Sequence, residues 1–391
     1  MENEMKVYDH EIVDQDRKWK EYAVGKLWEE RRRMSHTTLI KLKMDGAPQA
    51  SIYVKKETES ASGTLKHRFA WALVMWAVVE GKIKNGTTVY DSTSGNTGAS
   101  EAYMCRLIGV PYVAVVATSL DQEKKDHIEE FGGKLHFANA SERNAVAKEL
   151  AEKHGGFFIN QFANADEAEE YHESGTFVKE STNVFHEISR QLKDLNQSYP
   201  DYFIHCAGTG GTISSVGKYI NRYSIPTKII LSDSQFSLFY DYVAKDMYTN
   251  VSAGPDRPAW RNPGVEGIGY GYNKDPIILL RTIVDEVVRM PDIASAAAMR
   301  SLAKLNMDAG PSTGLNFLVA LSMAVQNKKP TSYVLIMGDP GKFYTSTYLN
   351  DTWIDQEMAY LGGMKVLNCW EEKIDRAINE GADFLKEGLM C

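Results

Sequence analysis

The sequence predicts an α/β fold in two lobes, and three observations support this. Short runs rich in β-branched residues alternate with stretches whose apolar residues recur at helical spacing, a pattern typical of parallel strands joined by crossover helices. Most of these runs end at glycine, serine or threonine, which suit the turns that follow strands. The length of 391 residues exceeds what one hydrophobic core usually serves, so we expect two lobes that share a cleft.

The expected strands are short and spread along most of the chain. They lie at 51–55, 88–91, 112–116, 134–137, 157–159, 202–206, 228–232 and 333–337. The helices expected between them lie at 66–79, 97–107, 121–131, 142–153 and 212–223. Several of these helices begin with serine or threonine, which can cap a helix N-terminus. A change to polar composition at 160–172 indicates a cleft or a hinge.

Helical extensions are expected at both ends of the α/β body, because Trp19 and Leu27 near one end, and Trp370 and Ile374 near the other, belong to apolar patterns of helical period. The expected division of the chain is a helical extension at 1–35, a smaller α/β lobe at 46–160, a larger α/β lobe made of 36–45 with 161–351, and a helical extension at 352–391.

Composition and charge exclude several classes of protein. A hydrophobic fraction of 43% with 25% charged residues is ordinary for a soluble globular protein. The net charge of −8 leaves no overall basic field for nucleic acid or an anionic membrane. No apolar run approaches the ~20 residues that span a bilayer, and the N-terminus lacks a secretory pattern, so we expect a cytoplasmic protein. We expect no metal site and four reduced thiols, because Cys105, Cys206, Cys369 and Cys391 have neither metal-ligand spacing nor the density of a disulfide scaffold.

Two segments that follow expected strands carry candidate reactive and anion-binding groups. Parallel sheets place ligand sites at such strand ends. Segment 62–68 (Ser-Gly-Thr-Leu-Lys-His-Arg) puts Lys66 at the start of an apolar helix, where partial burial lowers a lysine pKa and favours Schiff-base chemistry. Taken alone, a solvated lysine is the commoner interpretation. Segment 93–98 (Thr-Ser-Gly-Asn-Thr-Gly) opens the next helix, and its amides and hydroxyls suit a carboxylate or simply cap that helix.

Two further segments are rich in glycine and hydroxyl residues. Segment 208–212 (Gly-Thr-Gly-Gly-Thr) opens a helix and suits a phosphate, because glycines allow close approach and helix amides bind anions. Ile213 breaks the dinucleotide pattern and the P-loop ending is missing, so neither a dinucleotide nor a nucleoside triphosphate is indicated. Segment 310–314 (Gly-Pro-Ser-Thr-Gly) offers two hydroxyls to a ring nitrogen, or merely caps a helix.

In this order the four segments resemble the cysteine synthase and cystathionine β-synthase family of fold type II pyridoxal phosphate (PLP) enzymes. The resemblance covers about residues 36–351 and includes three more segments at 37–42, 265–269 and 339–347, similar to the family's Thr-Pro-Leu, Gly-Ile-Gly and Asp-Ser-Gly-x-x-Tyr-x-Ser-Thr segments. It implies a tryptophan synthase β-like fold, with PLP in the cleft between two lobes of parallel or mixed sheet. It also implies a homodimer.

The resemblance implies a role for each matching residue. Lys66 would hold PLP covalently, Asn96 would contact its phenolic oxygen and Ser312 would face its pyridine nitrogen. The phosphate would be held by Gly208, Thr209, Gly210, Gly211 and Thr212. The substrate carboxylate would be bound by Thr93, Ser94, Thr97 and Gln161. Departures from the family pattern are Thr38 for proline, Ala61 near the usual Asn-Pro, His67 for aspartate and Pro340 for serine.

The predicted reaction is β-elimination from a small sulfur amino acid. Segment 312–316 (Ser-Thr-Gly-Leu-Asn) is similar to the Ser-Thr-Gly-Thr-Asn of the family's cysteine desulfhydrases, which favours L-cysteine as substrate and sulfide, pyruvate and ammonia as products. β-Replacement, as in a cysteine, cystathionine or cyanoalanine synthase, uses the same residues and stays open. A third hypothesis is a catalytically silent sensor whose carboxylate-binding loop takes a partner's C-terminal peptide.

Overall fold

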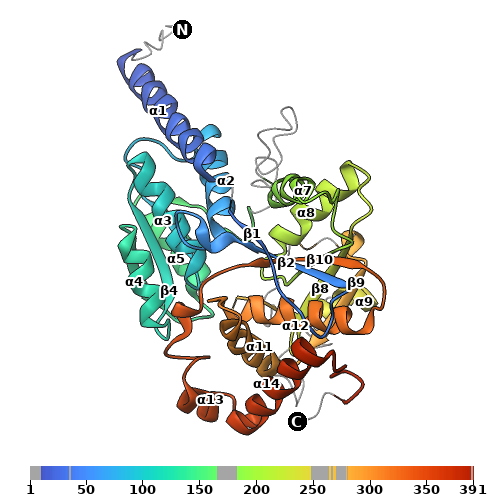
Figure 1. The fold of residues 1–391 in the computed structure, drawn as a ribbon. Coiled ribbons are helices and arrows are strands. Elements are labelled where there is room, and N and C mark those ends of the chain that lie inside the picture. The colour runs from blue at the N-terminus through green and yellow to red at the C-terminus, as the bar shows by residue number, and fades with distance from the viewer. Residues whose placement is uncertain are drawn as a thin grey trace, which may run out of the picture.

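The computed structural model describes residues 10–34, 37–164, 183–247, 264–265, 267–269, 279, 281–388 and 391. Within these residues the strands form two sheets, one of six strands in the order β1-β2-β10-β7-β8-β9 and one of four in the order β5-β4-β3-β6 (Figure 1). Helices pack on both sheets, which confirms the α/β class and the two separate sheets that the resemblance implied.

The larger sheet is parallel apart from one edge strand. Its strands are β1 (Leu39–Lys41), β2 (Ala50–Lys56), β7 (Tyr202–His205), β8 (Lys228–Ser234), β9 (Glu286–Met290) and β10 (Thr331–Met337). Only the β1–β2 pair is antiparallel among these strands. All residues of β10 are buried, as expected of a central strand covered on both faces. The carboxyl ends of β2, β10 and β7 therefore meet at one edge of this sheet.

The smaller sheet is parallel throughout. It contains β3 (Val89–Ser92), β4 (Tyr112–Ala117), β5 (Lys134–Ala138) and β6 (Phe157–Phe158). The expected strands match these elements and four strands of the larger sheet, β2, β7, β8 and β10, whereas β1 and β9 were not predicted. The division into lobes stays a proposal, and the sheet order places its first boundary after β2 rather than at residue 46.

The helices divide into buried and amphipathic ones. They are α1 (His10–Met34), α2 (Lys66–Val79), α3 (Asn96–Ile108), α4 (Gln122–Glu130), α5 (Arg143–Lys153), α7 (Val184–Asp194), α8 (Gly211–Arg222), α9 (Phe239–Lys245), α11 (Asp292–Lys304), α12 (Pro311–Gln326), α13 (Asp351–Glu357) and α14 (Gly363–Glu380). The apolar helices α2 and α12 are buried along almost their whole length. None of the described helices is long and apolar enough to cross a membrane.

Helix α1 and the C-terminal helices α13 and α14 pack against the hydrophobic core through their buried residues. Buried residues of α11, α12 and α14 cover one face of the larger sheet, and those of α7 and α8 cover the other (Figure 1). Ala23, Leu27 and Met34 of α1 belong to a third cluster, with α2, α3 and the smaller sheet. The expected helical extensions are therefore present and are packed against the core. Of the expected hinge, residues 160–164 form a turn, and 165–172 lie outside the described residues.

The expectation of four reduced thiols is wrong for two of them. Cys369 on α14 and Cys391 form a disulfide, with their Cα atoms 5.8 Å apart, whereas Cys105 and Cys206 are free and buried. Gly381 ends α14 in the left-handed conformation, and the carbonyl of Gly388 accepts a hydrogen bond from Lys373 on that helix. The chain after α14 thus turns back along the helix, a reversal that cysteine spacing alone did not reveal.

Candidate active site

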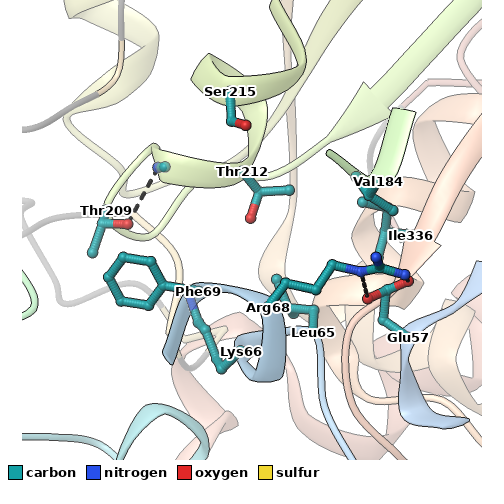
Figure 2. A pocket seen from close by; sticks show the side chains of 11 residues that line it. Glu57, Leu65, Lys66, Arg68, Phe69, Val184, Thr209, Thr212, Ser215 and Ile336 are labelled. Carbon is teal, nitrogen blue, oxygen red and sulfur yellow. Dashed lines mark hydrogen bonds and ion pairs between the residues drawn. The ribbon is translucent and has the colours of Figure 1, made fainter. Parts of the chain in front are cut away.

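A pocket at the carboxyl ends of the larger sheet's strands brings two of the candidate segments together. It encloses about 550 Å³ of empty space, open solvent included. Figure 2 shows Lys66 and Phe69 of α2 across from Thr209, Thr212 and Ser215. The pocket is lined by Glu57, Leu65, Lys66, Arg68, Phe69, Val184, Thr209, Gly211, Thr212, Ser215 and Ile336.

Lys66 is the first residue of α2 and its amine is available for chemistry. The Leu65 amide donates to the carbonyl of Gly338 just after β10 at 2.7 Å, and the Lys66 amide donates to Thr64 Oγ1 at 3.3 Å. Among the described residues the amine has no hydrogen bond or ion pair. Lys66 Nζ lies 6.0 Å from the centroid of the Phe69 ring. Burial lowers the pKa of Lys66, against the raising effect of Cys206 and Asp339. More of the amine is therefore neutral, and nucleophilic, than in a free lysine.

Segment 208–212 joins β7 to α8 in a conformation that requires glycine. Gly210 has a φ of 89°, and a Cβ there would lie 2.4 Å from the amide nitrogen of Leu279. The Gly211 amide donates to Thr209 Oγ1 at 3.3 Å. Because α8 begins at Gly211, its first amides face the pocket that Thr212 and Ser215 also line, which suits an anion such as a phosphate.

The charged side chains that line the pocket, Glu57 and Arg68, are neutralised by ion pairs. Arg68 donates to both carboxylate oxygens of Glu57, at 2.7 and 3.0 Å, and to Glu187 at 2.5 Å. Lys55 is fully buried, 2.8 Å from Glu187. Burial works against the charge of Arg68, but Glu57 and Glu187 outweigh it and raise the pKa of Arg68. The two cations balance the two carboxylates, so anion binding here depends on the amides and hydroxyls of segment 208–212.

Asn96, the first residue of α3, points toward a buried carboxylate. Asp339 Oδ2 accepts from Asn96 Nδ2 at 2.7 Å and from the Tyr344 hydroxyl at 2.5 Å. Burial raises the pKa of Asp339 despite these hydrogen bonds. Asn96 Oδ1 and Asp339 Oδ1 are buried and have no hydrogen-bond partner among the described residues. Such unpaired buried oxygens indicate a place where a polar ligand group completes the bonding.

Ser312 lies in the first turn of α12, close to the same strand ends. Its carbonyl is 4.0 Å from Cys206 Sγ, and its Oγ is 3.5 Å from where a Cβ on Gly338 would be. Gly338 also accepts the Leu65 amide, so Ser312, Cys206 and the lysine segment are close neighbours. Ser312 was predicted to face a ring nitrogen; its position near Lys66 is compatible with that role.

The proposed carboxylate-binding residues gather at the end of β3. Thr93 is buried, and its Oγ1 accepts from the amides of Gly95 and Gly98 at 3.2 and 3.0 Å. The buried Gln161 donates from Nε2 to the Ser92 carbonyl at 2.8 Å, so it lies beside this loop although far away in sequence. Thr97 is buried and Ser94 is exposed.

Sequence reasoning missed several residues of this site. Asp339, Tyr344, Cys206 and Ser215 were not singled out as site residues, although Asp339 comes two residues after the end of an expected strand and that position was a usable signal. The Glu57, Arg68 and Glu187 cluster joins two distant parts of the chain, since Glu187 lies 119 residues after Arg68, and no local pattern reveals it. Hydroxyls of Thr64, Thr93 and Thr209 do bind amides at helix starts, but the capping positions themselves are Leu65, Gly95 and Gly210.

Comparisons with known proteins agree on one family. The family described as "Pyridoxal-phosphate dependent enzyme" matches residues 32–339. A Caenorhabditis elegans protein provisionally named as pyridoxal-phosphate dependent is 52% identical over 97% of this chain and 91% of its own length. The L-cysteine desulfhydrase Cds1 of Mycobacterium tuberculosis is 32% identical over 87% of this chain and 91% of its own. A crystal structure of O-ureido-L-serine synthase superposes with a TM-score of 0.69 and 26% identity, over 85% of this chain and 98% of that one.

Proposed function

Since this chain belongs to the pyridoxal-phosphate dependent enzyme family, we propose that it catalyses β-elimination from L-cysteine. The reaction consumes one water and releases sulfide, pyruvate and ammonia. What carries the proposal is the pocket in which Lys66 faces the amides and hydroxyls of segment 208–212. The 32% identity with an L-cysteine desulfhydrase favours this reaction within the family.

The residues of the site fit pyridoxal phosphate. One end of the pocket has helix amides and hydroxyls for a phosphate, and the other has a lysine amine without a partner among the described residues. The unpaired oxygens of Asn96 and Asp339 suit the polar substituents of the ring. Lys66 would attach the cofactor, Asn96 and Ser312 would contact its ring, and the phosphate would be held by Gly208, Thr209, Gly210, Gly211 and Thr212.

The chain itself would bind the substrate and move its protons. Thr93, Ser94, Thr97 and Gln161 would hold the substrate carboxylate at the end of β3. When bound, pyridoxal phosphate supplies an electron sink for the pair released at the α-carbon. Lys66 Nζ would accept the α-proton, because burial lowers its pKa and leaves more of the amine neutral. The hydroxyl of Ser312 would bond the ring nitrogen without a full proton transfer, which favours loss of the β-substituent over transamination.

β-Replacement is the second candidate function, and the O-ureido-L-serine synthase likeness favours it. It differs from elimination in what happens after the leaving group departs, when a second nucleophile adds at the β-carbon. All the residues named above serve both reactions. Their side chains therefore do not separate the two, and product analysis does.

The test is an assay of purified protein loaded with pyridoxal phosphate. With L-cysteine alone we expect pyruvate and sulfide in equal amounts, and the Lys66→Ala variant should form neither. Lys84→Ala, which alters an exposed lysine beyond α2, is the matched control and should behave as wild type. If pyruvate forms neither with nor without an added thiol while a thioether product accumulates, β-replacement is the function. No turnover of either kind would favour the silent sensor.

A further inference from the structure

Helix α1 contributes a buried carboxylate close to the proposed active site. Glu30 lies two residues before the family match begins at residue 32, and it is 2% exposed. One of its oxygens is 3.0 Å from His67 Nε2, and the other accepts from the Tyr103 hydroxyl at 2.9 Å. His67 is fully buried and directly follows Lys66 in the first turn of α2. A segment outside the matched region thus contacts the neighbour of the proposed catalytic lysine.

The contact continues as a chain of hydrogen bonds. His67 Nδ1 is 3.0 Å from Ser62 Oγ, and Ser62 Oγ is 2.8 Å from Ser100 Oγ. Burial raises the pKa of Glu30, but the hydrogen bonds from His67 and Tyr103 outweigh burial and leave it below its ordinary value. One arrangement of the protons uses every donor in these hydrogen bonds: ionised Glu30 accepts from His67 Nε2, His67 Nδ1 accepts from Ser62, and Ser62 accepts from Ser100.

The hydrogen bonds from Glu30 to Ser100 join the segment before Lys66 to the Asn96 loop. Ser62 belongs to the segment that leads into Lys66, and Ser100 lies on α3, one turn after Asn96. The carbonyl of Ser62 is also held, 3.0 Å from Nε2 of His127 on α4. The same segment is also held by the Leu65 amide, which donates to Gly338, and by Thr64 Oγ1, which is 3.5 Å from Ser100 Oγ. Ser62 is therefore one of the points that hold the segment leading into Lys66 in place.

The position of α1 does not itself depend on Glu30. Trp71 Nε1 donates to the Leu27 carbonyl at 2.6 Å, and the rings of Trp28 and Trp71 meet edge to face with centroids 5.4 Å apart. Ala23 and Leu27 are fully buried in the core. Removing the Glu30 carboxylate should therefore leave the helix in place and change only the hydrogen-bond chain.

We propose that Glu30 is a positioning residue, which acts through His67 and Ser62 to hold Lys66 and the Asn96 loop in their working geometry. This inference rests on the proposed role of Lys66 as the cofactor lysine. It gives α1 a function in catalysis beyond packing, although α1 lies almost wholly outside the family match.

The test compares Glu30→Ala with a variant that breaks the other bond of the same carboxylate. Glu30→Ala should lower kcat with L-cysteine by about tenfold, because small displacements of a catalytic group cost rate, with KM nearly unchanged. Titration of the apoprotein with pyridoxal phosphate, followed by absorbance, should show weaker binding by about threefold or more. Tyr103→Phe keeps the His67 contact, so its kcat and cofactor affinity should stay at wild-type values even where its unfolding temperature falls.

Two further variants separate positioning from general stability. Glu30→Gln keeps an oxygen that accepts from His67, so it should restore most of the lost kcat. Ser62→Ala breaks the chain on the far side of His67 with a small change of volume, and it should reproduce the loss even if Glu30→Ala does not fold. Equal effects of Glu30→Ala and Tyr103→Phe, or wild-type kcat and affinity in Ser62→Ala, would overturn the proposal. Wild-type protein that fails to bind pyridoxal phosphate would instead overturn the proposed function.

Discussion

At the scale of single residues, Asp339 connects the Asn96 loop to the end of β10. It accepts hydrogen bonds from Asn96 and Tyr344. Asp339→Ala should release the Asn96 amide and weaken pyridoxal phosphate binding by about tenfold, the equivalent of one buried hydrogen bond of roughly 1.4 kcal/mol. Absorbance titration of the apoprotein measures this affinity. Tyr344→Phe keeps the Asn96 bond and should have a smaller effect, so the reverse order would contradict this role of Asp339.

Asp233, at the carboxyl end of β8, predicts a pH dependence of stability. Burial raises its pKa from 3.8 to about 7, against the lowering effect of neighbouring groups such as Arg289. Folded protein keeps this proton up to about pH 7 while the unfolded chain loses it near 3.8, so the free energy of unfolding falls as pH rises between these values.

Asp233→Asn removes this titration with little change of shape. Relative to that variant, wild type should lose roughly 2 to 4 kcal/mol of unfolding free energy between pH 4 and pH 7. Urea unfolding of both proteins across this pH range gives the difference. A constant difference at all pH values would show that Asp233 does not titrate in this way.

Residue patterns predicted the reactive and anion-binding segments of the site better than the contacts that distant residues make with them. Lys66 and segment 208–212 were found because each follows a strand and opens a helix, which are local features. Glu30, Glu57 and Glu187 contact the site from three distant segments. A buried carboxylate far along the chain has the same local pattern as an exposed one, and only the fold separates them.

At the scale of elements, the strands were predictable because most carry β-branched residues and end at turns. β9 (Glu286–Met290) was missed because its residues are mostly half-buried and include charged ones, as on the edge of a sheet. β1 (Leu39–Lys41) has three residues, too few for a periodic pattern. Which strand joins which sheet was beyond local reasoning, since β2 pairs with β10, far along the chain.

The disulfide between α14 and the last residue leads to a prediction about the end of the chain. Denatured, unreduced protein should show two reactive thiols, Cys105 and Cys206, in a thiol count. Cys391→Ser should lower the free energy of unfolding by about 3 kcal/mol, as estimated for closing a loop of this length. The difference should vanish when a reductant is present. Four reactive thiols in unreduced protein would contradict the pairing.

At the scale of the whole molecule, the parallel strands of the two sheets place their loops in one region. The carboxyl ends of β7 and β10 in the larger sheet carry segment 208–212 and Asp339, and that of β3 in the smaller sheet carries the Asn96 loop. The bond between Asn96 and Asp339 links the two groups directly. Helix α1 packs against α2 and α3, the two helices that begin at Lys66 and Asn96 (Figure 1). The homodimer that the family resemblance implies stays a prediction for sedimentation measurements.

The central claim is that Lys66 attaches pyridoxal phosphate at this junction. Borohydride reduction of the loaded protein, followed by digestion and peptide mass spectrometry, tests it directly. We expect a phosphopyridoxyl group on the peptide that contains Lys66, and its loss in Lys66→Ala, with the peptides of Lys55 and Lys124 unmodified. Modification of another lysine in wild type, or of none, would contradict the account.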